Sequence, residues 1–444
     1  MNSTSNDILP EAYKMTELGV LPEEWEVINL DKIIDLKRGI SWRKDEANKE
    51  GIGIPVIGIP NIKENGKIDF KDTYFLTKNI SSDKMVRIND ILFVGSSGSI
   101  KNIGRNVLIK EIQQNKFTYA SFTFLGRVNP LNANTVYIFY LLNSSFVDYG
   151  RYTRRASDGK YNFQLTQFKN EQKIPLPPLP EQQKIAAVLS AVQEAKEKTE
   201  AVIAATKALK KSMMKHLFTY GPVSPEETET VSLKETEIGP VPEDWEVVKL
   251  GEVAETYSGG TPSREQKKYF KGKIGWLKSG ELNDNNIYLT QEYITEEALK
   301  KSSAKYVENN TLLIAMYGAT VGKVGLAKAK FTINQAICAV NLNEKLWPEF
   351  YFFYFQMIRN KLLSMRFGGA QPNVNQQIIK QISLPLPPLP IQQKIASILS
   401  AIDAKIEAEE NKKKALEELF KSLLHNLMTG KIRVNNLKLN EKDI

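Results

Sequence analysis

The chain repeats itself once, and this internal repeat constrains its fold more than any other feature of the sequence. Residues 14–27 read KMTELGVLPEEWEV, and residues 234–247 read KETEIGPVPEDWEV. The hexapeptide PLPPLP stands at 175–180 and again at 385–390, each time followed by a QQKI segment and a long polar-apolar stretch. A head (14–27 and 234–247), a proline hexapeptide and a long polar-apolar segment therefore occur twice, as expected for two copies of one structural unit.

The bodies between these shared segments have diverged. Body 1 occupies about residues 29–174 and body 2 about 249–383. Plain duplication with drift would not confine its changes to the bodies. We therefore interpret the shared parts as a common frame and the bodies as surfaces directed at different targets.

The segments after the two hexapeptides have the pattern of long helices. Apolar or small residues recur in a rough heptad register at Leu189, Val192, Thr199, Ile203, Thr206, Met213 and Leu217, and at Leu399, Ile402, Ile406, Leu416, Phe420, Leu423 and Leu427. Each helix is expected to run roughly 35 to 40 residues. Because each apolar seam needs a partner, we expect the two helices to pair antiparallel, with one body at either end.

The hexapeptide is expected to be a stiff extended corner, with the helix beginning just beyond it. Proline lacks an N–H and fixes φ, so PLPPLP is neither helical nor a central strand. A ligand for a proline-binding domain is the alternative. Recurrence of the hexapeptide before each helix favours the structural corner.

Both bodies mix short β-rich runs with one aromatic-rich helical segment. The runs lie at 54–59, 91–94, 107–109 and 117–128 in body 1 and at 275–278, 311–317 and 332–342 in body 2, and the helical segments at 136–149 and 348–365. The predicted class is α+β (mixed α/β), with irregular, antiparallel-rich sheets. The whole chain is then two globular domains joined by a pair of long antiparallel coiled-coil helices, with an internal pseudo-two-fold repeat.

Composition favours a polyanionic partner and a reducing compartment. The formal net charge is +9, with 60 Lys plus Arg against 51 Asp plus Glu. Such an excess suits binding to phosphates. On charge alone, however, a protein that binds nucleic acid and one that does not are about equally expected. The single Cys338 excludes an internal disulfide, and no apolar run reaches the length of a membrane span. We therefore expect a cytoplasmic protein with no membrane partner and no signal peptide.

Glycine-rich loops recur at equivalent places in the two bodies. GSSGS at 95–99 with Gly104-Arg105 matches YGATVGK at 317–323, KRGISWR at 37–43 loosely matches SGGTPSR at 258–264, and RYTRRASDGKYN at 151–162 matches RFGGAQPNVN at 366–375. For a nucleotide site, tight hairpin turns are the preferred interpretation, because no GxxxxGK[ST] motif is present. For DNA, the Arg, Lys, Asn and Gln side chains on these loops are those that contact phosphates and base edges.

For any one residue a solvated loop is the simpler interpretation, but the set as a whole indicates DNA binding. The candidate DNA-binding residues of body 1 are Arg38, Ser41, Arg43, Lys101, Arg105, Arg151, Arg154, Arg155, Lys160 and Asn162. Those of body 2 are Thr261, Ser263, Arg264, Lys278, Tyr317, Thr320, Lys323, Arg366, Gln371, Asn373 and Asn375.

Motifs for catalysis are missing from the sequence. There is no NPP[FY] motif, dinucleotide fingerprint or Walker motif, and one cysteine with His216 and His425 cannot form a zinc cluster. We therefore expect no catalytic residues, no metal site and no cofactor on this chain.

The order and doubling of these motifs, from Lys14 to about Val434, resemble the specificity (S) subunit of type I restriction–modification enzymes. The motifs that carry the resemblance are the two heads, SGGTPS, GATVGK, QPNVNQ and the two PLPPLP–QQKI starts. Body 1 departs from the pattern, with Ile40-Ser-Trp where body 2 has Gly-Thr-Pro and with an insertion near Lys101.

The resemblance implies two target-recognition domains that each read one half of a split, asymmetric site in double-stranded DNA. It also implies two methyltransferase (M) subunits bound along the helices and restriction (R) subunits bound through them. S-adenosylmethionine, ATP and Mg²⁺ then belong to those partners. The expected segments are 1–174 (head and recognition domain 1), 175–220 (corner and helix), 221–383 (linker, head and recognition domain 2), 384–430 (corner and helix) and 431–444 (tail).

Two rival functions make different predictions. A fused modification–restriction enzyme needs the NPP[FY] motif that the chain lacks. A coiled-coil scaffold that binds only protein would show no salt-dependent binding to DNA.

Overall fold

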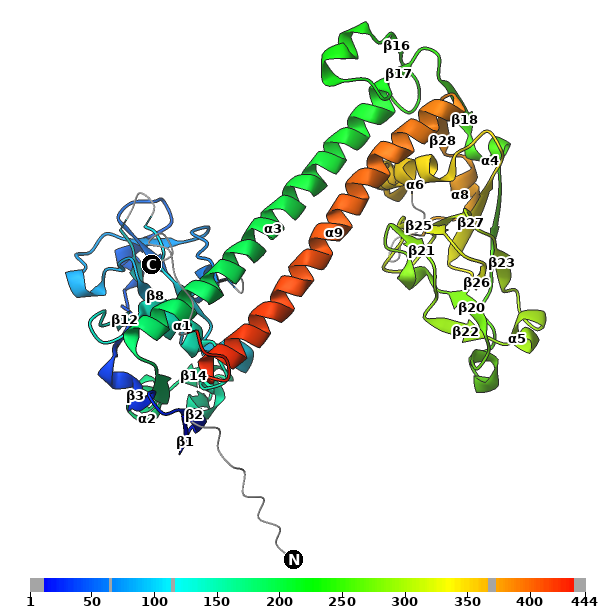
Figure 1. The fold of residues 1–444 in the computed structure, drawn as a ribbon. Helices are drawn as coiled ribbons and strands as arrows, with labels where there is room; N and C mark the ends of the chain where they lie inside the picture. The colour runs from blue at the N-terminus through cyan, green and yellow to red at the C-terminus, as the bar shows by residue number, and fades with distance from the viewer. Residues whose placement is uncertain (1–11, 64–65, 113–115, 366–372, 435–444) are drawn as a thin grey trace, which may run out of the picture. The chain divides into compact units, whose positions relative to one another are not determined.

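The computed structural model describes residues 12–63, 66–112, 116–365 and 373–434, which divide into two compact units. Unit 1 comprises residues 1–198 and 413–444, and unit 2 comprises residues 199–412. Two long helices, α3 (Leu179–Tyr220) and α9 (Leu389–Met428), each contribute one end to each unit (Figure 1). The predicted pair of long helices is confirmed.

The prediction of extended corners is wrong for most of each hexapeptide, which begins in a β-strand and ends in the first turn of a helix. The helices therefore begin within the hexapeptides and not beyond them. Strand β15 (Lys173–Leu176) includes Pro175, which lies opposite Val27 of β3 (Glu26–Asn29), and α3 begins at Leu179 within the hexapeptide. The same holds for β28 (Ser383–Leu386), β18 (Glu246–Lys249) and α9. Proline is tolerated at these positions because β15 and β28 lie in two-stranded sheets and because the first helical turn needs no proline N–H.

Within each unit the two helices run antiparallel. In unit 2, Lys207 pairs with Glu410 (2.6 Å) and Lys210 with Asp403 (2.7 Å), so residue numbers rise along α3 as they fall along α9. In unit 1, the Lys196 ammonium lies 5.9 Å from the centre of the Phe420 ring, and Glu181 near the start of α3 bonds to Arg433 just beyond the end of α9 (2.7 Å), so the order is again opposite. The predicted seam residues Leu189, Ile203, Leu217, Leu399, Ile406 and Leu427 are all buried.

The body of unit 1 is built on an antiparallel sheet of order β10-β8-β12-β4. Its strands are β10 (Asn106–Leu108), β8 (Asp90–Val94), β12 (Thr123–Val128) and β4 (Ile34–Arg38). A second sheet has the order β11 (Thr118–Tyr119), β6 (Ile54–Ile57), β7 (Tyr74–Leu76) and β5 (Ala47–Asn48), with β11 and β6 parallel. A third joins β13 (Thr153–Arg155), β14 (Tyr161–Phe163) and β9 (Ser96–Ser97). Helices α1 (Thr135–Leu142) and α2 (Leu165–Glu171) complete the body.

Unit 2 repeats this plan. Its main sheet has the order β21 (Asn285–Ile287), β25 (Val324–Ala327), β24 (Leu312–Ala315), β27 (Ile337–Leu342) and β19 (Ala254–Ser258). The second sheet is β22 (Glu292–Ile294), β20 (Ile274–Leu277), β26 (Phe331–Ile333) and β23 (Lys305–Val307), with β20 and β26 parallel. The helices are α4 (Leu250–Val253), α5 (Glu296–Lys300), α6 (Pro348–Met357), α7 (Arg359–Ser364) and α8 (Gln376–Lys380).

The heads of the two copies are small hairpins. Strands β1 (Tyr13–Thr16) and β2 (Gly19–Pro22) pair in unit 1, and β16 (Leu233–Lys234) and β17 (Val241–Pro242) pair in unit 2. The head tryptophans Trp25 and Trp245 are fully buried. Their burial explains why both heads have a tryptophan at this point.

Most of the predicted strands are confirmed, but the predicted helix over 136–149 is wrong beyond Leu142. The Asn143 and Ser144 side chains donate hydrogen bonds to the carbonyls of Phe139 (2.8 Å) and Leu141 (2.7 Å). Side chains that bond to the backbone in this way compete with helical hydrogen bonding. The predicted segment 348–365 is helical but consists of two helices, α6 and α7, with Ile358 between them. None of the described helices is long and apolar enough to cross a membrane.

Candidate nucleic-acid interface

The glycine loops of the two units lie at the same point of the main sheet. In unit 1 the Val94 N–H donates to the Arg105 carbonyl (2.8 Å), and in unit 2 the Ala315 N–H donates to the Lys323 carbonyl (2.9 Å). The loops connect antiparallel neighbours, β8 with β10 and β24 with β25. Arg105 and Lys323 are therefore equivalent. Both loops connect antiparallel strands, but the loop of unit 1 contains β9 and the turn Ile100–Asn102 and is thus longer than the tight hairpin turn that the sequence predicted.

The segments that lead into the two proline hexapeptides also occupy equivalent places in the two units. The Phe163 N–H donates to the Gly95 carbonyl (2.9 Å), and the Val374 N–H donates to the Met316 carbonyl (2.8 Å). The residues just before these donors, Asn162 and Asn373, are therefore equivalent. Each lies beside the end of a central strand, next to the glycine loop.

In unit 1 the third sheet joins the glycine loop to the arginine-rich hairpin. Arg154 lies opposite Asn162, and Asn162 lies opposite Ser96 of β9. Arg154, Arg155 and Lys160 are exposed on this hairpin. Segments that are far apart in the sequence thus form one polar and basic surface.

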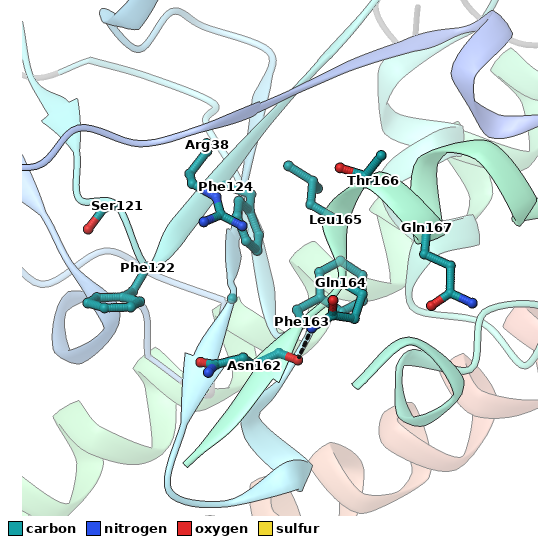
Figure 2. A pocket seen from close by; sticks show the side chains of 11 residues that line it. Arg38, Ser121, Phe122, Phe124, Asn162, Phe163, Gln164, Leu165, Thr166 and Gln167 are labelled. Atoms are coloured by element: carbon teal, nitrogen blue, oxygen red, sulfur yellow. Dashed lines mark hydrogen bonds between the residues drawn. The ribbon is translucent and has the colours of Figure 1, made fainter. Parts of the chain in front are cut away.

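A cavity of about 240 Å³ opens beside this surface. Figure 2 shows the side chains of Arg38, Phe122 and Asn162 around one space. The Arg38 guanidinium lies 5.5 Å from the centre of the Phe124 ring, and the Gln164 amide donates to the Asn162 carbonyl (3.4 Å). The cavity combines a cation, the three amides of Asn162, Gln164 and Gln167, and exposed aromatic surface, which are the groups that recognise base edges.

The other candidates of unit 1 do not line this cavity. The Ser41 carbonyl accepts from Lys78 (2.8 Å), the Arg43 N–H donates to Glu46 (2.8 Å), and Lys101 is exposed in the turn Ile100–Asn102. Arg151 stacks on Tyr152 (5.5 Å). These residues border the loops, and only Arg38 and Asn162 of the predicted set share the cavity.

In unit 2 one carboxylate holds two of the predicted cations. Glu292 accepts from Arg264 (2.7 Å) and from Lys278 (2.5 Å). Arg264 also stacks over Phe270 (4.2 Å) and Trp276 (5.0 Å). These hydrogen bonds hold the pKa of the Glu292 carboxyl below its usual value, and the bond from Arg264 has the larger effect. The carboxylate therefore partly neutralises the basic character expected of this surface.

The remaining candidates of unit 2 gather around the same loops, with Ser263 exposed beside Arg264. The Thr320 hydroxyl donates to the Ser279 carbonyl (2.7 Å), and the Lys323 ammonium donates to Asn283. Asn375 caps α8 by accepting from the Ile378 N–H (2.9 Å), and Asn373 is exposed. Arg366 and Gln371 lie outside the described residues.

Sequence reasoning missed Gln335, which lies in the loop between β26 and β27. Its Oε1 accepts from the Thr261 hydroxyl (2.5 Å), and it also hydrogen-bonds the Tyr317 hydroxyl. Burial is the larger effect on Tyr317 and raises its pKa. Gln335 thus links two predicted candidates. The only sequence signal was a polar Asn-Gln pair interrupting an apolar run, which is also the signal of an ordinary turn.

No metal site is evident in the described part of the chain, which holds no suitable group of three or more His, Cys, Asp and Glu residues. The geometry is that of two similar polar loop surfaces, each carried on a β-sheet. Such surfaces can bind and discriminate, and their side chains suggest contacts with a nucleic acid.

Comparison with known proteins gives concordant matches over most of the chain. The family model for the type I restriction modification DNA specificity domain matches twice, at residues 22–205 and 242–418. The putative type I restriction enzyme MjaX specificity subunit of Methanocaldococcus jannaschii is 33% identical, covering 96% of this chain and 97% of the relative.

Two solved structures share the fold at 17% sequence identity. The S subunit of a type I restriction–modification system from M. genitalium has a TM-score of 0.60 and covers 91% of this chain and 96% of its own. A structure described under complex assembly and conformational transition of the type I R-M system has a TM-score of 0.56 and covers 93% and 99%.

Proposed function

The chain belongs to the family of type I restriction–modification DNA specificity proteins, and from this premise we propose how its two units share the recognition of DNA. It is the DNA specificity subunit of such a system. Each body reads one half of a bipartite, asymmetric site in double-stranded DNA. The observation that carries this proposal is that the two bodies share one frame but present different side chains at equivalent positions.

The division of the chain follows from this role. Recognition domain 1 corresponds to residues 1–174 and recognition domain 2 to residues 221–383. The segments 175–220 and 384–430 serve as the helical frame, and 431–444 as the tail. This division keeps each long helix whole, whereas the two compact units each take one end of both helices.

The subunit acts together with methyltransferase and restriction subunits. Two M subunits bind along the helices, and R subunits bind through them. The chain itself supplies recognition and no catalysis, so S-adenosylmethionine, ATP and Mg²⁺ are bound by the partners. The lack of methyltransferase and Walker motifs supports this assignment.

Exchange of one body tests the proposal. Residues 29–174 are replaced by the matching body of the M. jannaschii relative, and methylated sites are mapped in host DNA with the complete complex. We expect one half-site to change while the other half stays the same. The reciprocal exchange of residues 249–383 serves as the control and should change only the other half.

Two outcomes would contradict the proposal. A change in both halves after a single exchange would show that the bodies do not read separately. Methylation that does not depend on this chain, together with DNA binding insensitive to salt, would favour the protein-only scaffold.

A further inference from the structure

The loop that carries Gln335 has an equivalent in unit 1. A main-chain N–H just after β8 donates to the Phe122 carbonyl (2.9 Å), and the matching N–H after β24 donates to the Ala336 carbonyl (2.8 Å). The residue just before each acceptor is Ser121 in unit 1 and Gln335 in unit 2. A serine and a glutamine therefore occupy the same position in the two recognition surfaces.

The end of the adjacent edge strand also differs between the units. Arg38 lies opposite Phe124 in the pairing of β4 with β12, and Ser258 lies opposite Cys338 in the pairing of β19 with β27. Phe124 and Cys338 each stand two residues after the equivalent acceptors. Arg38 and Ser258 are therefore equivalent, and unit 1 has a guanidinium where unit 2 has a hydroxyl.

Arg38 is poised to form two parallel hydrogen bonds. Its guanidinium is oriented over the Phe124 ring (5.5 Å) and lines the cavity with Asn162. No salt bridge to Arg38 is formed within the described part of the chain, so its donors are not occupied by a carboxylate. A guanidinium with free donors matches the O6 and N7 acceptors of guanine in the major groove.

Unit 2 cannot form this contact at the equivalent point. The Ser258 hydroxyl accepts from the Gln376 amide (2.7 Å), and the neighbouring cations Arg264 and Lys278 are held by Glu292. Gln335 is exposed, and Thr261 fixes the orientation of its amide. Thr261 occupies one lone pair of the amide oxygen, which leaves a second acceptor site, and the NH2 group has two N–H donors, so the exposed amide can still donate to N7 and accept from N6 of adenine.

We propose that unit 1 reads a guanine through Arg38, whereas unit 2 reads an adenine through Gln335. The two surfaces thus use different positions of the same frame for base readout. This inference rests on the proposed function, since it assigns one base pair within each half-site. It predicts a guanine·cytosine pair in the half-site of body 1 and an adenine·thymine pair in that of body 2.

Two reciprocal substitutions test the inference, each placing in one unit the residue that the other unit has. Arg38→Ser and Gln335→Ser are introduced separately into the full chain, and the assembled complex methylates a plasmid library with randomised half-sites. Arg38→Ser is expected to reduce discrimination for guanine at one position about 5- to 150-fold, the effect of losing a bidentate contact of about 1–3 kcal/mol. Gln335→Ser is expected to relax one adenine position in the other half-site to a similar extent.

Matched variants separate readout from charge and folding. Arg87 is an exposed arginine of the same unit that does not line the cavity, and Arg87→Ser should leave the site preference unchanged. Arg38→Lys keeps the charge but lacks the fork, so it should retain part of the guanine preference. Methylation of relaxed sites by each variant shows that the complex has assembled.

The other outcomes would contradict either this inference or the proposed function, and they can be told apart. If Arg38→Ser weakens binding equally at all sequences and lowers the salt dependence by about one phosphate contact, Arg38 contacts the backbone and the inference is overturned. Unchanged discrimination in both serine variants would also overturn it. If the unaltered complex itself shows no bipartite preference, the proposed function fails, which is a different result.

Discussion

At the scale of single residues, Glu292 holds two of the cations in unit 2 that are candidates for DNA binding. It binds both Arg264 and Lys278, and side-chain hydrogen bonds from these two cations lower its pKa. A carboxyl group with a lowered pKa stabilises the fold above its unfolded-state pKa and loses that contribution as the pH falls through the lowered value. The carboxylate therefore stays ionised around neutral pH, and it would compete with DNA phosphates for its two partners.

We predict that Glu292→Gln strengthens the binding of DNA at low salt. The substitution removes one negative charge and releases up to two cations for phosphate contacts. The slope of log K against log salt should become steeper by about 0.9 for each phosphate newly contacted. Fluorescence anisotropy with duplex DNA between about 50 and 200 mM salt measures this slope.

Glu297→Gln is the control for this prediction. Glu297 also pairs with two lysines, Lys268 (3.1 Å) and Lys301 (3.0 Å), but neither is a candidate for DNA binding. The control should change affinity less than Glu292→Gln. Equal effects of the two substitutions would show that net charge alone, and not release of Arg264 and Lys278, governs binding.

At the scale of elements, the polar residues in the helix seam are held by specific partners. Lys210 of α3 bonds to Asp403 of α9 (2.7 Å) and to Gln356 of α6 (3.0 Å), and it lies over the Phe353 ring (5.1 Å). Its side chain is only 16% exposed. A charge so far from solvent needs its partners, which explains how a lysine can interrupt an apolar register.

We predict that Asp403→Ala destabilises unit 2 by about 1–3 kcal/mol, because it leaves a largely buried ammonium without its carboxylate. Glu410→Ala removes the partner of the exposed Lys207 and should cost no more than about 1 kcal/mol. Urea denaturation followed by helical circular dichroism compares the two variants. If Lys210→Met added to Asp403→Ala restored no stability, the unpaired ammonium would not be the cause.

At the scale of the whole molecule, the long helices are expected to set the spacing of the DNA site. A four-residue insertion after Glu200 lengthens α3 by roughly 6 Å, or nearly two base pairs at about 3.4 Å each. Four residues are about one turn plus 40°, so the apolar stripe is approximately preserved. We predict the same two half-sites separated by one or two additional unspecified base pairs.

Methylation mapping of the insertion variant checks this spacing. A two-residue insertion at the same place is the control, because it rotates the stripe by about half a turn and should impair pairing of the helices. Recovery of the original spacing with full activity in the four-residue variant would show that something other than the helices sets the distance.

The sequence by itself determined the repeat, the two long helices, most strands and the family. These features depend on local periodicity and on residues close together in the chain, such as the seam from Leu189 to Leu217 and the β-rich run at 91–94. Even locally there were limits. Pro175 lies in a strand and Leu179 begins a helix, although the hexapeptide was expected to form neither. The pairing of Pro175 with Val27 and the tolerance of proline in a first helical turn both depend on context.

The candidate site was only partly predictable. The sequence placed Asn162 and Asn373 on equivalent polar loops and Arg38 on a different loop, and the tertiary structure brought Arg38 and Asn162 together in one cavity. Only that structure decided that Arg264 and Lys278 share Glu292 and that Gln335 joins Thr261. Such partners lie on different strands and loops, so their meeting depends on sheet register and loop geometry, which no local pattern encodes.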